Sequence, residues 1–295
     1  MYQDIKSSVK YKNKISATFP CVRQGENLSP LLFALYLNDL EAFLLDHDCK
    51  GVQTEYYGNE LLNYLKIFVL LYADDTVLFA DNVKNMNIML NAFGEYCTLW
   101  KLNVNINKTK LVIFGSRGQS NATFSLLNRD LEICDSYNYL GVVFSKGCSF
   151  AQAQQRIKNQ ASKALHLLYS RIHNLNLPID CQLKLFDHTI LPILLYGCEI
   201  WGFGDLSPIE TIHNQFLRNI LKVKKSTPLY MLYGETGRYP LSIYIKHRMV
   251  SFWIKMISGK VGKYLLLLYK SLLINDVNHT NKWLITIKNT LTDCG

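Results

Sequence analysis

The sequence has eight cysteines in 295 residues, yet no two of them are separated by only two residues. Zinc knuckles and dithiol redox sites are built on such closely spaced pairs, so the pattern excludes both. The residues that follow Met1 form no apolar run of the kind found in a secretory leader. Scattered cysteines without a leader are typical of reduced, mostly buried thiols, and we therefore expect an intracellular protein.

Long uninterrupted hydrophobic runs are also absent. The two most apolar stretches, residues 61–80 and 190–203, are broken by charged residues or proline (Lys66, Asp74, Asp75, Pro192 and Glu199). A membrane-spanning helix needs about 20 consecutive apolar residues, so we expect no membrane partner. With 49% hydrophobic and 19% charged residues, the chain is nevertheless able to bury a large core. Its length suggests about two domains.

Acidic residues are scarce in one part of the chain. Residues 206–270 contain 11 lysines and arginines but only 2 acidic residues, an excess equal to the formal net charge of +9 for the whole chain. A basic surface of this kind favours a polyanionic partner, and nucleic acid is the usual one. A soluble domain that is merely basic is the alternative.

Hydrophobic periodicity divides the chain into a mixed half and a helical half. Residues 1–147 contain short β-branched and aromatic runs as well as two helical patterns, at 30–45 and 85–102. From residue 148 on, apolar residues recur at helical spacing and prolines separate the segments. The pattern therefore predicts an α+β fold. The expected strands lie at 14–19, 65–72, 76–80, 111–114, 131–133 and 139–144, and the expected C-terminal helices at 151–172, 182–191, 209–221 and 246–257.

Two adjacent carboxylates, Asp74 and Asp75, lie between the strand-like runs 65–72 and 76–80 and are therefore expected at the tip of a hairpin. Adjacent carboxylates repel each other, and a divalent cation such as Mg²⁺ relieves that repulsion through oxygen ligands. Two cations held by carboxylates and substrate phosphates are the usual means of in-line phosphoryl or nucleotidyl transfer. Because aspartate is also common in turns, a solvated acidic turn is the competing interpretation.

A glycine turn precedes the first helical pattern. Ser29 is followed by Pro30, a combination typical of a helix N-cap and the first helical position. Gly25 lets a nucleobase or ribose approach the backbone closely, and Gln24 offers an uncharged hydrogen-bonding edge. The helix N-terminus is also a favourable place for phosphate. An ordinary glycine turn before a helix explains the same residues without a ligand.

Several motifs follow one another along the chain. They are Val22-Arg23-Gln24-Gly25, Leu28-Ser29-Pro30, Phe33, Tyr36 and Asp39-Leu40; then Tyr72-Ala73-Asp74-Asp75; then Asn105 with Lys108-Thr109; then Tyr139-Leu140-Gly141-Val142; and finally Leu195-Tyr196-Gly197 with Glu199 and Trp201. In this order they resemble motifs of the reverse transcriptases of non-LTR (LINE-type) retrotransposons. The corresponding family motifs are the template- and nucleotide-pocket motif, the catalytic hairpin, the lysine motif, the primer-grip hairpin and the segment that follows the thumb.

The resemblance implies an RNA-directed DNA polymerase that extends a DNA primer on an RNA template, using dNTPs and Mg²⁺, or Mn²⁺ in its place. Asp74 and Asp75 would be the catalytic metal ligands, and Lys108 would meet the triphosphate, with Lys110 as the alternative. Such a protein would be assembled in the cytoplasm and act in the nucleus. The remaining implied sites are Arg23, Gln24, Gly25 and Ser29 for nucleotide and template binding, and Tyr139, Leu140 and Gly141 for the primer grip.

The same resemblance divides the chain into three expected domains. Residues 1–147 would form part of a polymerase palm, an antiparallel sheet with packed helices. Residues 148–225 would form a helical thumb and connection, and residues 226–295 a basic helical C-terminal extension. The basic helical half would track the backbone of the RNA–DNA duplex.

One element of the family pattern is missing. A polymerase palm requires a third carboxylate on an earlier strand, and residues 1–21 contain only Asp4, in a polar segment. Two carboxylates offer too few oxygens to hold two cations. We therefore expect the fingers and the first catalytic strand to be absent, and the chain alone to be a weak or inactive polymerase. A non-catalytic nucleic-acid-binding remnant of a mobile element, or a remnant without function, is the alternative.

Overall fold

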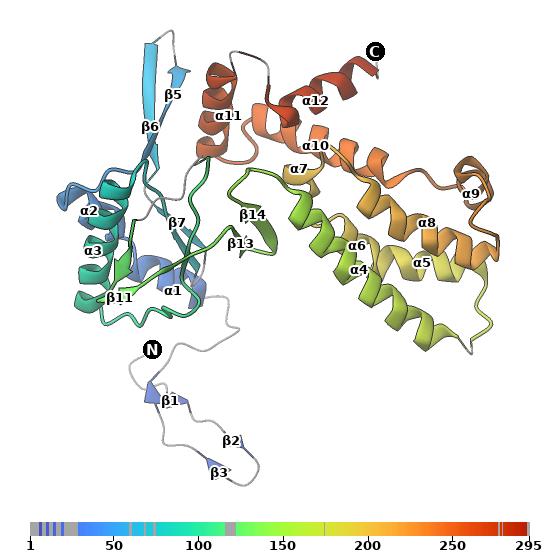
Figure 1. Ribbon diagram of the computed structural model, residues 1–295, viewed down its shortest axis with the longest axis horizontal. Coiled ribbons are helices and arrows are strands. Elements are labelled where there is room, and N and C mark those ends of the chain that lie inside the picture. Colours follow the sequence, from blue (N-terminus) through green and yellow to red (C-terminus); the bar gives the residue numbers. More distant parts are fainter. Residues whose placement is uncertain are drawn as a thin grey trace. The chain divides into compact units, whose positions relative to one another are not determined.

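The computed structural model describes residues 6–7, 10–11, 14–15, 19–20, 29–58, 61–67, 69–72, 75–115, 122–173, 175–276, 278 and 280–293. The chain divides into two compact units. The smaller unit comprises Met1–Gln53, Lys66–Ile106 and Ala122–Leu131, and the larger unit comprises Thr54–Leu65, Asn107–Asn121 and Glu132–Gly295. Figure 1 labels the elements of both. Helices and short strand pairs occur in each unit, so the predicted mixture of α and β structure is confirmed.

In the smaller unit, helices pack around one hydrophobic cluster that includes the fully buried Tyr96 and Met89. Val69 and Leu78, which face each other across a strand pair, pack against this cluster. The helices are α1 (Ser29–Tyr36), α2 (Leu40–Asp46) and α3 (Val83–Leu99), and the antiparallel pairs are β1 (Lys6–Ser7) with β4 (Phe19–Pro20), β2 (Lys10–Tyr11) with β3 (Lys14–Ile15), β7 (Val69–Tyr72) with β8 (Asp75–Leu78), and β10 (Ser125–Leu126) with β11 (Arg129–Asp130).

Helix α3 confirms the amphipathic helix predicted at 85–102. The side chain of Asn82 caps its first turn by accepting a hydrogen bond from the backbone N–H of Asn85 at 2.9 Å. A stripe of methionines and aromatic residues along this helix faces inward, since Met89, Tyr96 and the neighbouring Cys97 are almost fully buried. The stripe is therefore core packing, as its helical spacing indicates.

The single helix predicted at 30–45 is wrong, because α1 and α2 are separated by a turn at residues 37–39. Asn38 and Asp39 occupy this turn, and both residue types compete with helical hydrogen bonding. The hydroxyl of Tyr96 donates a hydrogen bond to Oδ1 of Asp39 at 2.6 Å. A contact 57 residues distant in sequence thus holds the break in place.

The larger unit combines short strand pairs with a set of packed helices. β9 (Lys110–Leu111) runs parallel to β12 (Glu132–Ile133), and β13 (Ser136–Tyr139) is antiparallel to β14 (Val142–Ser145). A further hairpin pairs β5 (Val52–Gly58) with β6 (Leu61–Ile67). The helices are α4 (Ala151–Ile172), α5 (Ile179–Thr189), α6 (Leu191–Leu194), α7 (Cys198–Trp201), α8 (Ser207–Leu221), α9 (Leu229–Thr236), α10 (Leu241–Ile257), α11 (Lys263–Asn275) and α12 (Lys282–Asp293).

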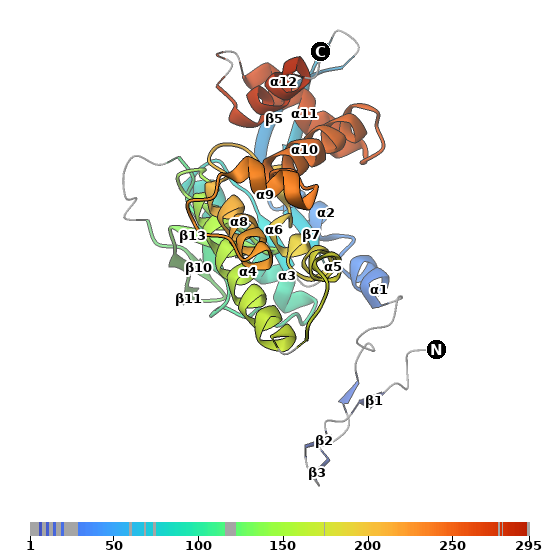
Figure 2. The same cartoon turned by 90° about the vertical axis from the view of Figure 1, so that its right-hand side faces the viewer.

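One hydrophobic cluster holds these helices together. α4 and α8 lie side by side in both Figure 1 and Figure 2, and β14 packs against α4. Trp201, Phe186 and Phe216 belong to the cluster and are fully buried. Trp253 and Trp283 pack against it from α10 and α12. All three tryptophans thus pack between helices.

The C-terminal helices agree well with the sequence pattern. The helix predicted at 151–172 is α4, with the same limits. Those predicted at 182–191, 209–221 and 246–257 begin a few residues earlier, as α5, α8 and α10. A proline lies at each start: Pro178 and Pro240 directly precede α5 and α10, and Pro208 is the second residue of α8. No helix among the described residues combines the length and apolar character needed to cross a bilayer.

The strands of the N-terminal half are shorter than predicted. The expected strand at 139–144 is wrong, because Leu140 and Gly141 form a turn between β13 and β14. The expected strand at 111–114 is reduced to β9, which ends at Leu111. The domain limits at residues 147 and 225 stay a prediction.

Candidate functional site

The acidic hairpin forms where the sequence predicts it. β7 and β8 are antiparallel, and their last pair joins Tyr72 to Asp75, so residues 73 and 74 connect the strands. The side chain of Asp75 is exposed at the start of β8. Asp74 lies outside the described residues. Asp75 is therefore hydrated and accessible to a cation.

The fit of a metal ion rests on the chemistry of these donors. Adjacent carboxylates provide the oxygen ligands that Mg²⁺ and Mn²⁺ prefer. Within the part of the chain that the structure describes, no three histidine, cysteine, aspartate or glutamate side chains come together as a metal site does. Asp74 and Asp75 thus fit a divalent cation by type, and their ligation stays a prediction.

The expected nucleotide and template residues are only partly described. Arg23, Gln24 and Gly25 lie outside the described residues. The sequence predicts Ser29 as the N-cap of a helix that starts at Pro30, but helix α1 already includes Ser29 as its first residue, and the side chain of Ser29 is not described. Further along the same motif, the ring of Tyr36 packs edge-on against Trp100, with ring centroids 5.0 Å apart, and its hydroxyl donates to the Trp100 carbonyl oxygen. Tyr36 thereby fixes the end of α1 against the end of α3.

Lys108 lies in an exposed turn of the larger unit, whereas Asp75 belongs to the smaller unit. The Tyr137 hydroxyl donates to the backbone carbonyl oxygen of Lys108 at 3.5 Å. The alternative lysine, Lys110, forms an ion pair with Glu132, with 2.5 Å between Nζ and Oε2. Glu132 thus already pairs with the charge of Lys110, and the choice between Lys108 and Lys110 stays a prediction. A shared cleft of Lys108 with Asp74 and Asp75 stays a prediction.

The predicted primer-grip residues Tyr139, Leu140 and Gly141 lie at the tip of the β13–β14 hairpin. Leu140 and Gly141 have φ angles of 47° and 82°, the left-handed pair that a two-residue hairpin turn requires. The hydroxyl of Tyr196 donates to the carbonyl oxygen of Leu140 at 2.8 Å. A Cβ on Gly141 would lie only 2.9 Å from Cε1 of Tyr196. Tyr196 thus holds the tip of the hairpin in place through this hydrogen bond, and its ring leaves room for no side chain at position 141.

The segment around Tyr196 is itself held by several hydrogen bonds from surrounding helices. Nε1 of Trp201 donates to the Tyr196 carbonyl oxygen at 2.8 Å, and Nη1 of Arg248 donates to the Leu195 carbonyl oxygen at 2.8 Å. Trp283 donates through Nε1 to the Glu199 carbonyl oxygen at 2.7 Å. The residues 195–201 therefore link the hairpin tip to helices α10 and α12. The sequence motif marked Tyr196 but assigned it no role.

Helix α4 begins a few residues after this hairpin and contains no aspartate or glutamate. Its exposed side carries amides and cations, which line a shallow hollow (Gln152, Gln155, Arg156, Asn159, Gln160 and Lys163). Amides donate and accept hydrogen bonds, and the two cations are not opposed by carboxylates on the same helix. Such a side is suited to contact with phosphates.

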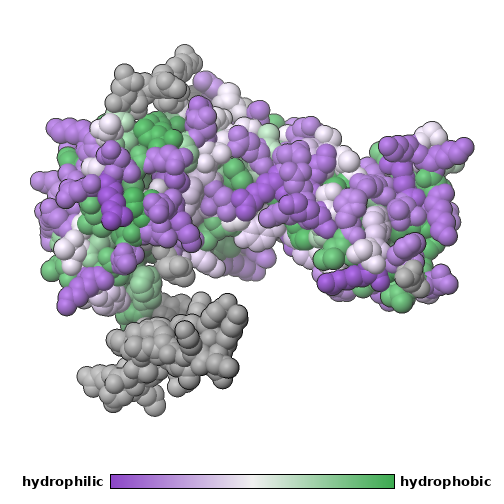
Figure 3. Space-filling model, turned by 60° about the horizontal axis from the view of Figure 1, so that its bottom comes forward, coloured by the Kyte–Doolittle hydropathy of each residue, from purple (hydrophilic) through white to green (hydrophobic). Residues whose placement is uncertain are grey.

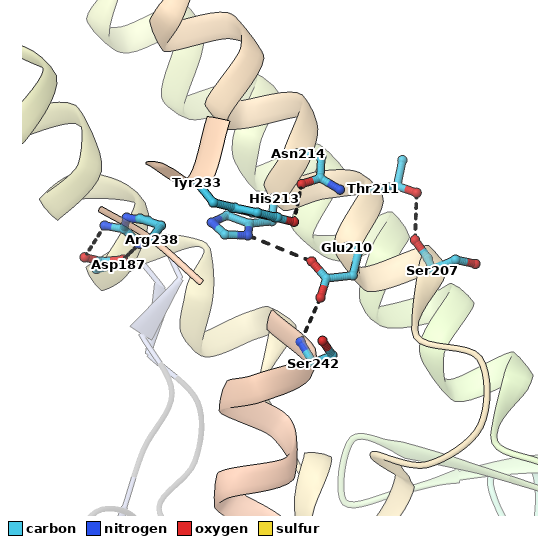
Figure 4. Close-up of polar contacts among 9 residues, drawn as sticks. All are labelled: Asp187, Ser207, Glu210, Thr211, His213, Asn214, Tyr233, Arg238 and Ser242. Atoms are coloured by element: carbon cyan, nitrogen blue, oxygen red, sulfur yellow. Dashed lines mark hydrogen bonds and ion pairs between the residues drawn. The ribbon is translucent and has the colours of Figure 1, made fainter. Parts of the chain in front are cut away.

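A buried polar cluster inside the larger unit was not predicted from the sequence. Figure 4 shows its contacts among α5, α8, α9 and α10. His213 is fully buried, with Nδ1 at 4.0 Å from Oε2 of Glu210, and Glu210 also accepts a hydrogen bond from the backbone N–H of Ser242. Arg238 forms a bidentate ion pair with Asp187, with both contacts under 2.8 Å.

Burial, the largest cause, and the Arg238 cation lower the pKa of His213, Asp187 partly offsets them, and the resulting pKa is about 4. His213 is therefore neutral at neutral pH. The cluster joins helices and lies within the core, so its role is structural.

Comparison with known proteins bears on the same residues. Residues 2–144 match the family model described as reverse transcriptase (RNA-dependent DNA polymerase). The chain is 22% identical over 231 residues to the RNA-directed DNA polymerase from mobile element jockey of Drosophila melanogaster, a match that covers 75% of this chain and 23% of that protein. In the same species it is 23% identical to the RNA-directed DNA polymerase assigned to transposon X-element and 24% identical to the one assigned to transposon BS.

The latter two matches cover 72% and 85% of this chain, and 23% and 27% of the relatives. The chain thus spans about a quarter of the length of these relatives. The matched region contains the acidic hairpin, Lys108 and the β13–β14 hairpin in the order that the motifs predict. Residues 2–144 therefore belong to the reverse transcriptase family, and the chain is a relative of the polymerases of non-LTR (LINE-type) mobile elements.

Proposed function

We propose that this chain is the palm and thumb part of an RNA-directed DNA polymerase that extends a DNA primer with dNTPs on an RNA template. Residues 1–147 would supply the partial palm, residues 148–225 the thumb and connection, and residues 226–295 a basic extension. The observation that carries the proposal is the β7–β8 hairpin within the matched region, in which Asp75 begins β8 and Asp74 directly precedes it in the sequence.

Bound divalent cations, Mg²⁺ or Mn²⁺, would supply activation of the primer 3′-hydroxyl and charge neutralisation at the pyrophosphate. Asp74 and Asp75 would hold them, with Asp75 at the start of β8. Lys108 offers positive charge, or a proton, to the leaving phosphates. The Leu140–Gly141 turn supports the primer strand, and Tyr196 fixes the position of this turn. Arg23, Gln24 and Gly25 would meet the incoming nucleotide and the template.

The rate expected of the chain alone is low. The hairpin offers two carboxylates, and two cations at catalytic separation need more fixed oxygen ligands than these side chains provide. We therefore expect slow extension, or none, without further polymerase residues.

Metal ligation can be tested apart from turnover. Mn²⁺ binding, followed by electron paramagnetic resonance, is expected to be lost in Asp74→Asn and weakened in Asp75→Asn. Asp130→Asn removes an exposed aspartate of β11 and serves as the matched control. Primer extension on an RNA template, wherever it is measurable, should disappear in Asp74→Asn as well. Unchanged Mn²⁺ binding in Asp74→Asn would show that the metal assignment is wrong.

The second candidate function is nucleic-acid binding without catalysis. The acid-free side of α4 and the basic stretch 206–270 favour it, because neither needs a metal. Binding of an RNA–DNA duplex that weakens steeply with salt, in a protein that neither binds Mn²⁺ through Asp74 nor extends a primer, would support it.

A further inference from the structure

The segment that joins α8 to α10 exposes lysines and aromatic rings together. Lys222, Lys224 and Lys225 are exposed between α8 and α9. Tyr230, in the first turn of α9, is 72% exposed, and Tyr239, just beyond its end, is 62% exposed. We call these five residues the lysine–tyrosine corner. In Figure 3, the end of the larger unit where α5, α8 and α9 lie shows hydrophobic patches bordered by hydrophilic residues.

The backbone of the corner is fixed by hydrogen bonds. The N–H of Val223 donates to the Arg218 carbonyl oxygen at 3.1 Å, and the N–H of Thr227 donates to the Lys224 carbonyl oxygen at 3.1 Å. The Arg218 guanidinium also donates to the Thr227 carbonyl oxygen at 3.3 Å. Side chains on such a preformed turn lose less freedom when they bind a partner.

Helix α9 sets the spacing of the two rings and is anchored to α8. The Tyr233 hydroxyl donates to Oδ1 of Asn214 on α8 at 2.8 Å. α9 has eight residues and is therefore about 12 Å long. Tyr230 and Tyr239 thus lie near opposite ends of a short rigid element, at a separation that an oligonucleotide of a few residues can bridge.

The positive charge of the corner is not neutralised locally. Between residues 206 and 270 the only carboxylates are Glu210 and Glu235. Glu210 is turned inward, where it accepts from the Ser242 N–H at 2.7 Å. Across the described ranges, none of the three corner lysines has a carboxylate within 4.0 Å. The corner therefore favours an anionic partner over a partner protein whose surface lacks acidic residues.

The exposed rings of Tyr230 and Tyr239 indicate which kind of anion the corner binds. The bases of a duplex are stacked on one another and shield their faces, whereas those of a single strand are free to stack on an aromatic side chain. Lysines near the rings can meet the phosphates between successive bases. We infer that the lysine–tyrosine corner binds single-stranded nucleic acid, with the lysines on phosphates and with Tyr230 and Tyr239 stacked on bases. The inference rests on the proposed function, because a polymerase that copies RNA must handle an unpaired template strand.

The stacking contribution is tested on the full chain by fluorescence anisotropy, with a labelled 12-nucleotide RNA and a labelled 12-base-pair RNA–DNA duplex. The double variant Tyr230→Ala/Tyr239→Ala is expected to bind the single strand about tenfold or more weakly, and the duplex within about twofold of the unchanged chain. Tyr230→Phe should retain binding, because the ring is kept. Tyr264→Ala, which removes a tyrosine that is 74% exposed on α11, is the matched control.

The phosphate contribution is tested by salt titration of the single-stranded RNA. Replacing Lys222, Lys224 and Lys225 by Gln should reduce the slope of log affinity against log salt by about 2, since each single-strand phosphate contact contributes about 0.7. The control replaces Lys50, Lys84 and Lys101, which are exposed and lie outside the basic stretch 206–270, and changes the net charge equally. An equal change in the control would show general basicity and overturn the inference.

Single-stranded binding that is the same in all variants would also overturn the inference, and would assign the corner to another class of partner, such as a protein. The outcome is separable from that of the proposed function. If RNA binding depends on the corner but Mn²⁺ binding does not depend on Asp74, the proposed polymerase function is contradicted and the inference about the corner stands. If Mn²⁺ binding depends on Asp74 but RNA binding does not depend on the corner, only the inference about the corner is contradicted.

Discussion

In the turn between β13 and β14, the ring of Tyr196 restricts which residue can stand at position 141. Gly141 has a φ of 82°, and a Cβ there would lie 2.9 Å from Cε1 of Tyr196. We expect Gly141→Ala to lower the free energy of unfolding by about 1–2 kcal/mol, through backbone strain and displacement of the ring. Urea denaturation measures the loss. Gly147→Ala is the control, since a Cβ there meets nothing within 4 Å; an equal loss at both glycines would contradict the clamp.

A second residue-scale effect concerns the buried imidazole of His213. It faces Glu210 on its own helix, Asp187 on α5, and Tyr233 and Arg238 from α9 and its end. The folded pKa, about 4, lies below the ordinary value of 6.5, so the unfolded chain takes up a proton first as the pH falls. Stability attributable to His213 is therefore complete above pH 6.5 and is lost between about pH 6.5 and 4, by about 3 kcal/mol.

Urea titrations at several pH values test this effect. His213→Leu is expected to flatten the decline in the free energy of unfolding between pH 6.5 and 4. His166→Gln removes an exposed histidine of α4 and should leave the decline unchanged. If the free energy of unfolding falls between pH 6.5 and 4 as much in both variants as in the wild-type chain, His213 is not the group responsible.

At the scale of elements, α4 is the helix placed to follow a duplex. Its exposed Arg156 and Lys163 lie along one shallow hollow, without carboxylates on the same helix. Arg156→Gln combined with Lys163→Gln should lower the affinity for an RNA–DNA duplex and reduce the salt slope by about 2, at about 0.9 for each phosphate contact. Lys50→Gln combined with Lys84→Gln removes the same charge from exposed positions outside the basic stretch 206–270. A similar slope in the two double variants would argue against α4 as the contact.

Elements with a sustained helical period could be predicted from sequence, whereas those fixed by distant contacts could not. Residues 151–172 repeat buried positions such as Ile157 and Leu165 at helical spacing, and α4 has the predicted limits. The break between α1 and α2 depends on Tyr96, and the β13–β14 turn depends on Tyr196. Neither partner is visible in the local pattern. The local residues, Asn38 with Asp39 and Gly141, are compatible with the two turns, but the contacts that fix them come from elsewhere in the chain.

The candidate site divides in the same way. The hairpin that carries Asp75 was predictable, because two β-rich runs enclose a short acidic turn. The ion pair of Lys110 with Glu132 was not, since it arises from the pairing of β9 with β12. The buried cluster around His213 was also missed, because single polar residues in a helical pattern give no sign of which neighbours they will meet.

For the whole molecule, two separate hydrophobic clusters predict two steps of unfolding. Cys97 is buried in the smaller unit and Cys198 in the larger, and burial raises the pKa of each thiol to about 11. Both should resist alkylation until their unit opens, because the thiolate is the reactive form. The cluster of the larger unit contains more buried residues, so its unfolding should require more denaturant.

Iodoacetamide labelling at increasing urea, read by mass spectrometry, is expected to modify Cys97 before Cys198. The exposed Cys148 should react without urea and serves as the reference. Simultaneous labelling of Cys97 and Cys198 would mean that the two clusters unfold as one.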